Sequence, residues 1–182
     1  MTWAVVYALL LAALVVRVRS TDAAPPEPVW PQANEPLWLT RLHHGLFALL
    51  LIGVPFERMV VRGAPNGRLA GACLFAAGVA LYRVAGRTLG DALSPFTEPR
   101  ATAPLVTGGL YRWVRHPMYL SQALIAIGAP LTLGSRQVVL LAVPALVILV
   151  LRVLREEEAL ARTFPEYARY AARTKRILPF VY

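Results

Sequence analysis

The sequence predicts an all-α integral membrane protein with about five transmembrane helices. Three observations support this fold class: 57% of the 182 residues are hydrophobic, only 16% are charged, and the mean hydropathy is +0.53. A soluble domain contains fewer apolar and more charged residues. The apolar residues also come in blocks close to the length of a membrane span, so we expect a single membrane domain over residues 1–182.

The candidate spans are five apolar blocks, several of which are shorter than the ~20 residues that a perpendicular crossing requires. They cover residues 3–18, 37–56, 69–85, 118–133 and 138–151. The first block could instead be a signal peptide, but no charged residue precedes it. Arg17 and Arg19 also stand where a small-residue cleavage site would be expected. We therefore interpret residues 3–18 as a helix.

The basic residues predict how the chain is oriented in the membrane. With five crossings, all but four of the 19 Lys and Arg residues fall on the side of the C-terminus. The four on the other side are Arg58, Arg62, Arg68 and Arg136. The positive-inside rule therefore predicts an external N-terminus and a cytoplasmic C-terminus, in the inner (plasma) membrane if the source is bacterial. The net charge of +9 fits loops that face anionic membrane lipids, and no soluble basic domain indicates nucleic-acid binding.

Two polar connections separate the blocks. Residues 23–36 contain five prolines, so we expect an extended linker held at the interface by Trp30 and Trp38. Residues 88–104 form the longest polar connection and lead directly into a cluster of ionisable and aromatic residues. The single Cys73 lies inside a span, and we predict neither a disulfide nor a metal site.

The first polar cluster occupies residues 109–119, at the start of the fourth block. Because His116 precedes Pro117, we expect this histidine at or just before the N-terminus of the next helix. Arg115 and His116 could merely extend toward lipid headgroups. The tyrosines at both ends of the cluster could likewise belong to an interfacial aromatic belt.

The second polar cluster occupies residues 152–158, where the fifth block ends. Arg152 and Glu156 are four residues apart, so they share one helix face and could form an ordinary surface ion pair. The two clusters flank one hydrophobic hairpin, and this arrangement predicts a single site that both clusters form.

Together, the two clusters and the C-terminal tail resemble the isoprenylcysteine carboxyl methyltransferase family, within the small membrane methyltransferases that include phospholipid N-methyltransferases. The resemblance covers about residues 81–182, which we interpret as the cofactor-binding half, whereas residues 1–80 share only their hydropathy. Two positions depart from the family pattern: Ala103 stands where His is frequent, and Ser121 where Gly is common. The matched positions are Thr88 to Gly90, Leu105, Val106, Gly109, Tyr111, Arg115, His116, Pro117, Tyr119, Arg152, Glu156, Glu157, Leu160, Phe164, Tyr167, Tyr170 and residues 178–182.

The resemblance implies a cytosolic pocket, formed by the loop before the penultimate helix and by the C-terminal tail, that binds S-adenosylmethionine. It implies that Glu156 reaches the ammonium group of the cofactor and that Arg152 faces the methyl acceptor as the catalytic residue. A carboxylate suits an ammonium group, while His116 at a helix N-terminus suits the cofactor carboxylate. The implied cofactor-binding residues are Leu105, Val106, Tyr111, Arg115, His116, Pro117, Met118, Tyr119, Glu156 and Glu157.

The function that this resemblance favours is methylation of a carboxylate on a lipophilic small molecule or lipidated substrate that enters from the bilayer. One alternative is a phospholipid N-methyltransferase. Another is an NADPH-dependent enzyme similar to sterol reductases, which also carry His-Pro-x-Tyr before a span and a Tyr-rich tail. The arrangement of Arg152, Glu156 and Glu157 favours the methyltransferase, and a non-enzymatic scaffold would leave both polar clusters unexplained.

Overall fold

The computed structural model describes residues 2–15, 36–61, 66–100 and 102–177 of the chain. These residues form helices and no strand, apart from one isolated bridge between Val114 and Lys175. The predicted all-α fold class is therefore confirmed. The helices are α1 (Thr2–Val15), α2 (Leu37–Val60), α3 (Arg68–Leu89), α4 (Pro117–Leu133), α5 (Ala142–Thr163) and α6 (Tyr167–Arg173), with 3-10 turns η1 (Gly90–Ala92), η2 (Gly109–Arg112) and η3 (Val138–Leu141).

Three of these helical stretches are long and apolar enough to cross a membrane, and the protein is an integral membrane protein. They are Leu37–Val60, Arg68–Ala92 and Val138–Thr163. Two shorter apolar helices, Trp3–Val15 and Pro117–Leu133, correspond to the first and fourth predicted blocks. At 1.5 Å per residue α4 is about 26 Å long, slightly less than the hydrocarbon core of ~30 Å. Each predicted block thus contains a helix.

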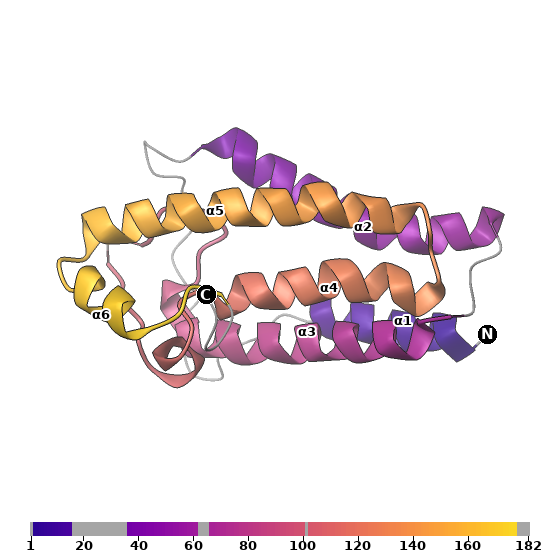
Figure 1. Cartoon of the computed structure of the whole chain (residues 1–182), viewed down its shortest axis with the longest axis horizontal. Helices are drawn as coiled ribbons and strands as arrows, with labels where there is room; N and C mark the ends of the chain where they lie inside the picture. The colour runs from indigo at the N-terminus through magenta and orange to yellow at the C-terminus, as the bar shows by residue number, and fades with distance from the viewer. Residues whose placement is uncertain (1, 16–35, 62–65, 101, 178–182) are drawn as a thin grey trace.

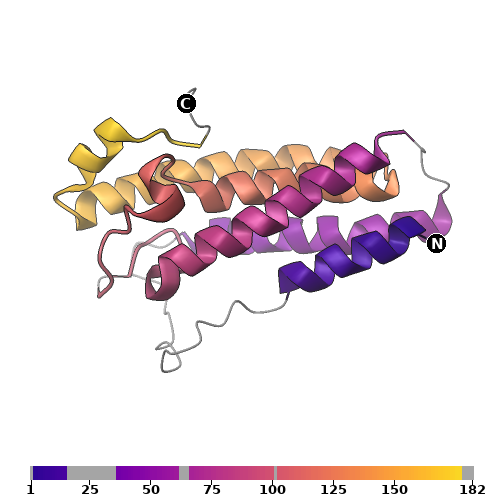
Figure 2. The same ribbon diagram turned by 90° about the horizontal axis from the view of Figure 1, so that it is seen from below.

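The helices form an elongated bundle with α4 at its centre (Figure 1). α4 packs against α3 most extensively and also contacts α1, α2 and α5. Seen from below, α1 lies on the outer side of α3 (Figure 2). η1, η2 and α6 gather at one end of the bundle, and the N-terminus of α1 lies toward the other end (Figure 1). The chain segments that carry the two polar clusters therefore meet at one end.

α3 and α4 approach closely because both carry glycines at their contact. A Cβ atom on Gly128 would lie 2.4 Å from the backbone nitrogen of Phe75, and one on Gly71 would lie 2.5 Å from that of Thr132. Small residues allow this approach of backbones between membrane helices, where dispersion contacts drive association. The close packing fixes the start of α4 beside the end of α3, where the polar clusters lie.

Glu57 of α2 stabilises the opposite end of the bundle. Its carboxylate accepts hydrogen bonds from the backbone N–H groups of Arg136 at 3.0 Å, Gln137 at 3.2 Å and Val138 at 3.0 Å. These donors lie in the turn between α4 and α5, at the start of η3, where N–H groups lack helical partners. The side chain is 8% exposed, so this contact is an internal one between α2 and the α4–α5 hairpin.

Several predicted features lie outside the described residues. They are most of the Pro-rich linker with Trp30, the basic residues Arg17, Arg19 and Arg62, and the closing residues 178–182. The proposed division at residue 80 falls inside α3, so the two halves are regions of sequence rather than separate structural units. The single-domain assignment stays a prediction.

Candidate active site

A cavity of about 370 Å³ lies at the end of the bundle where α4 begins. Its walls come from α2, the loop between α3 and η2, the start of α4, and the C-terminal part of α5. This volume falls within the range of small-molecule and cofactor pockets. The two polar clusters of the sequence therefore border one space.

Nine of the eleven predicted site residues line this cavity. The other two, Pro117 and Glu157, do not. Pro117 is buried as the first residue of α4, where its fixed φ favours the start of a helix, so its part is structural. The lining residues are Leu105, Val106, Tyr111, Arg115, His116, Met118, Tyr119, Arg152 and Glu156.

Glu157 binds basic groups of the protein rather than facing the cavity. Its Oε1 atom accepts a hydrogen bond from Arg115 Nε at 2.8 Å and lies 3.3 Å from His116 Nε2. Its Oε2 atom lies 2.8 Å from a terminal nitrogen of Arg176. Three basic groups thus converge on one carboxylate, which joins α5 to the segment before α4 and to the segment after α6.

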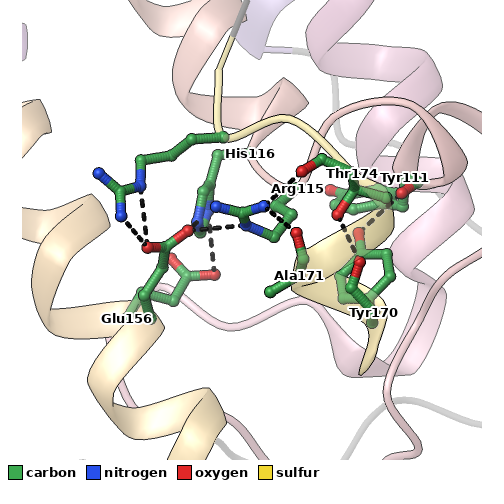
Figure 3. Close-up of polar contacts among 9 residues, drawn as sticks. Tyr111, Arg115, His116, Glu156, Tyr170, Ala171 and Thr174 are labelled. Carbon is green, nitrogen blue, oxygen red and sulfur yellow. Dashed lines mark hydrogen bonds and ion pairs between the residues drawn. The ribbon is translucent and has the colours of Figure 1, made fainter. Parts of the chain in front are cut away.

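The segment after α6 also pairs directly with the segment before α4. Backbone hydrogen bonds of 2.8 to 3.1 Å join residues 113–116 to residues 175–176. The Arg115 guanidinium donates to the carbonyl oxygens of Ala171 at 2.9 Å and Thr174 at 2.6 Å (Figure 3). Residues 171–176 therefore fix the backbone that carries Arg115 and His116 into the cavity wall.

Glu156 differs from Glu157 because its carboxylate lines the cavity and has weaker partners. Its side chain is 29% exposed, and its one ion-pair contact in the described residues is at 4.0 Å, to His116 Nδ1. The Tyr119 hydroxyl also interacts with it. The Glu156 carboxylate can therefore accept a charge-assisted hydrogen bond from a ligand ammonium group.

Two tyrosines border the cavity as neutral hydrogen-bonding groups. The Tyr170 hydroxyl donates to the Tyr111 carbonyl oxygen at 2.7 Å (Figure 3). Burial raises the pKa of Tyr170 to about 12, although the Arg115 guanidinium opposes the shift. Burial, and then the nearby Glu156 carboxylate, raises the pKa of Tyr111 well above its usual value. Both hydroxyls therefore stay protonated at neutral pH, and their rings offer aromatic faces to a ligand.

Arg152 is a buried cation whose hydrogen-bonded partners are neutral. Its side chain donates to Thr40 Oγ1 at 2.7 Å and to the Pro95 carbonyl oxygen at 2.8 Å, and the residue is 4% exposed. Its Nε atom has no hydrogen-bond partner, and the described residues form no ion pair with it. Because burying an unpaired charge is unfavourable, this environment favours an anionic ligand group beside Arg152.

Unpaired polar atoms are concentrated around the same cavity. Six buried side-chain nitrogen or oxygen atoms in the described residues lack a hydrogen-bond partner in the protein, and five of them belong to cavity-lining residues. Buried polar groups in native proteins are almost always paired. Their concentration here indicates a polar ligand. The five atoms are His43 Nδ1, Arg100 Nε, Tyr111 Oη, Gln122 Oε1 and Arg152 Nε.

A family model described as "Phospholipid methyltransferase" matches residues 67–167, more than half of the chain. The chain belongs to the phospholipid methyltransferase family. The resemblance to the small membrane methyltransferases is thereby confirmed at the level of this wider group. A comparison with curated proteins finds no match for the chain.

The phospholipid methyltransferase match has different limits from the resemblance seen in the sequence. It begins at residue 67, at the start of α3, rather than near residue 81, and it ends at residue 167. It therefore includes the closely packed α3–α4 pair and α5 but excludes Tyr170 and the segment after α6. The match favours a methyltransferase over an NADPH-dependent reductase.

The connection predicted at residues 88–104 contributes a large part of the cavity wall. Residues 92–100 and 103–104 line the cavity. Glu98 forms an ion pair with Arg162 at 2.8 Å, which joins this loop to α5. Gly109 has a φ of +57°, and a Cβ atom there would lie 3.0 Å from Thr88 Cγ2, so the start of η2 packs against the first residue of the connection.

The two departures from the family pattern have different consequences. Ala103 lines the cavity, where its methyl side chain offers no hydrogen bond to a ligand. Ser121 is fully buried, and its hydroxyl donates to the Met118 carbonyl oxygen within α4. The first departure changes the polarity of the cavity wall. In the second, the hydroxyl group of Ser121 is hydrogen-bonded within α4.

The sequence reasoning missed several polar residues that line the cavity. Among them are His43, His44, Tyr82, Arg100 and Gln122. For Gln122 a signal was present, because polar side chains inside membrane helices usually face the bundle interior or a cavity. His43 and the adjacent His44 lie in α2, far along the chain from both clusters, and nothing in the sequence relates them to those clusters.

Proposed function

We propose that this protein is an S-adenosylmethionine-dependent methyltransferase that acts on a lipophilic acceptor, with a carboxylate as the preferred methyl-accepting group. When bound, S-adenosylmethionine supplies an electrophilic methyl group on a sulfonium. The observation that carries the proposal is the set of five buried, unpaired polar atoms around one cavity in a chain of the phospholipid methyltransferase family.

The residues of the outer part of the cavity fit this cofactor chemically. Glu156 offers a carboxylate to the ammonium group, and His116 at the start of α4 offers a polar contact for the carboxylate. The rings of Tyr111 and Tyr119 offer faces to the adenine or to the sulfonium cation. Residues Leu105 and Val106 add an apolar wall.

Arg152 provides the contact for the methyl acceptor in this proposal. It lies one helical turn before Glu156, about 6 Å farther along the axis of α5 and deeper in the bundle. Its buried guanidinium would orient an anionic acceptor group, while the surrounding walls exclude water. Methyl transfer is a direct displacement whose main requirement is alignment, so a positioned acceptor suffices and no side chain need move a proton for a carboxylate acceptor.

The cofactor assignment is tested by calorimetry on the purified protein in an uncharged detergent. S-adenosylhomocysteine should bind with one-to-one stoichiometry, and NADPH should give no binding heat. Binding of NADPH without binding of S-adenosylhomocysteine would overturn the proposal in favour of the reductase.

Phospholipid N-methylation is a second candidate, and the family match is equally consistent with it. The two reactions leave products of different stability, because a methyl ester is cleaved by mild base and an N-methyl group is not. Incubation with methyl-labelled S-adenosylmethionine and either long-chain carboxylic acids or aminophospholipids would separate them. Base-labile label on the acids supports the preferred acceptor, and base-stable label on the phospholipids supports the second candidate.

We also propose that the cavity end of the bundle faces the cytoplasm and that the acceptor enters from the bilayer. Most described basic residues lie in segments at this end, whereas Arg58, Arg68 and Arg136 belong to the turns at the other end. The positive-inside rule supports this orientation. It gives the cavity access to a soluble cofactor and leaves the lipophilic part of the acceptor among the spans.

A further inference from the structure

His43 on α2 is a buried polar residue of the cavity that belongs to neither polar cluster. It is 5% exposed, and its Nδ1 atom has no hydrogen-bond partner. The residue lies outside the part of the chain that matches the phospholipid methyltransferase family. An unpaired imidazole nitrogen in a membrane helix is unfavourable, and a ligand contact in the cavity would satisfy it.

The position of His43 relative to Arg152 follows from the geometry of α2. Thr40, whose hydroxyl accepts a hydrogen bond from Arg152 at 2.7 Å, lies three residues before His43 on the same helix. Residues three apart are neighbours on a helix surface, with Cβ atoms about 5 to 6 Å apart.

Arg152 of α5 and His43 of α2 both line the cavity, and each has a buried nitrogen atom without a hydrogen-bond partner. Arg152 Nε can only donate a hydrogen bond, and a neutral imidazole can donate through Nδ1. These two donors, one of which belongs to a guanidinium cation without an ion-pair partner, match the two oxygens of a carboxylate or of another anionic group.

We propose that His43 is a second acceptor-binding residue, which donates a hydrogen bond from Nδ1 to the anionic group that Arg152 binds. This inference rests on the proposed function, which identifies this part of the cavity as the acceptor site. α2 would then contribute to acceptor specificity. The acceptor class is a lipophilic molecule whose head group carries two oxygen atoms that share a negative charge.

The test compares the binding of dodecanoate with that of dodecanol, which has the same chain without the charge, to the full-length protein in an uncharged detergent with S-adenosylhomocysteine present. The wild-type protein should bind dodecanoate at least about 10-fold more tightly. His43→Leu should reduce this preference by about 10-fold, because the variant cannot donate this hydrogen bond to the charged group. His43→Asn, which keeps an N–H donor near the Nδ1 position, should retain most of it.

His44→Leu is the matched control. This neighbouring histidine also borders the cavity, but its side chain is exposed and its Nδ1 atom is already bonded to the Thr40 carbonyl oxygen at 2.8 Å. The preference for dodecanoate should therefore survive this change. Thermal unfolding provides the structural control: His43→Leu should not lower the melting temperature of the ligand-free protein, because it removes an unpaired buried polar group.

The inference would be overturned by a dodecanoate preference that is unchanged in His43→Leu, or by an equal loss of that preference in His44→Leu. Equal binding of dodecanoate and dodecanol by the wild-type protein would also overturn it. A protein that does not bind S-adenosylhomocysteine but keeps a His43-dependent preference for dodecanoate would refute the proposed methyltransferase while supporting the anion contact.

Discussion

Glu156 and Glu157 are adjacent in α5 but have different partners, so replacing each by glutamine separates a ligand contact from a structural one. Glu156→Gln removes the charge proposed to meet the cofactor ammonium group. A hydrogen bond to a charged group contributes about 1.5 to 3 kcal/mol, which corresponds to a roughly 10- to 150-fold weaker affinity for S-adenosylhomocysteine. Stability should change little, because Glu156 and His116 are 4.0 Å apart and such a long ion pair stabilises the protein only weakly.

Glu157→Gln should have the opposite profile. It removes the anion that Arg115, His116 and Arg176 share, at distances of 2.8, 3.3 and 2.8 Å. Breaking a buried ion pair costs about 3 to 5 kcal/mol. We expect a destabilisation near the lower limit of that range, because the Arg176 side chain is 27% exposed to solvent. Its affinity for S-adenosylhomocysteine should change less than that of Glu156→Gln, because Glu157 does not line the cavity.

Calorimetry with S-adenosylhomocysteine and thermal unfolding in the same detergent measure both quantities for both variants. The result that would refute the reasoning is unchanged affinity in Glu156→Gln together with a large loss of affinity, at wild-type stability, in Glu157→Gln. That outcome would make Glu157 the ligand contact and would reassign the cavity wall.

Three further predictions concern the acceptor, the bundle and the topology. Arg152→Ala should abolish methyl transfer to a carboxylate acceptor while S-adenosylhomocysteine still binds. Arg152→Lys should restore little activity, since an ammonium group cannot reproduce the guanidinium contacts. An alanine variant that is active in a methyl-transfer assay would favour a neutral acceptor. Gly128→Ala should lower the free energy of unfolding by about 1 to 3 kcal/mol, and with it the melting temperature, because the new Cβ atom would lie 2.4 Å from a backbone atom of α3. Gly45→Ala, which meets nothing within 4 Å, is the control, and equal melting temperatures would contradict the packing account. A reporter that works only in the cytoplasm should be active when fused after Tyr182, and activity of a periplasmic reporter there would invert the orientation.

The sequence predicted the positions of the spans well but not their ends. The fifth apolar block ends at residue 151, and the helix was expected to continue through Arg152 and Glu156. α5 does so and extends further, to Thr163, because Arg, Glu, Ala and Leu are good helix formers. The second block was expected to end at residue 56, and α2 continues to Val60. There Glu57 bonds to backbone groups about 80 residues away, a contact that no local pattern shows.

The site was predictable where polar residues interrupt the ends of apolar blocks. His116 and Glu156 stood out for that reason, and the structure brings both to one cavity. The sequence did not predict that Glu156 lines the cavity while Glu157 binds Arg115, because this difference depends on which side of α5 faces Arg115. His43 was missed because the packing of α2 on α5, and not spacing in the sequence, brings it near Arg152.

The pairing of residues 113–116 with residues 175–176 ties completion of the cavity to the order of protein synthesis. All five apolar helices end before residue 164, so the segment that pairs with residues 113–116 is the last part of the site to be synthesised. The backbone that carries Arg115 and His116 gains its partners only after residue 176 has been released from the ribosome. A chain that ends before Thr174 would therefore contain all five apolar helices but lack the partners that hold Arg115 and His116, and its cavity would be incomplete.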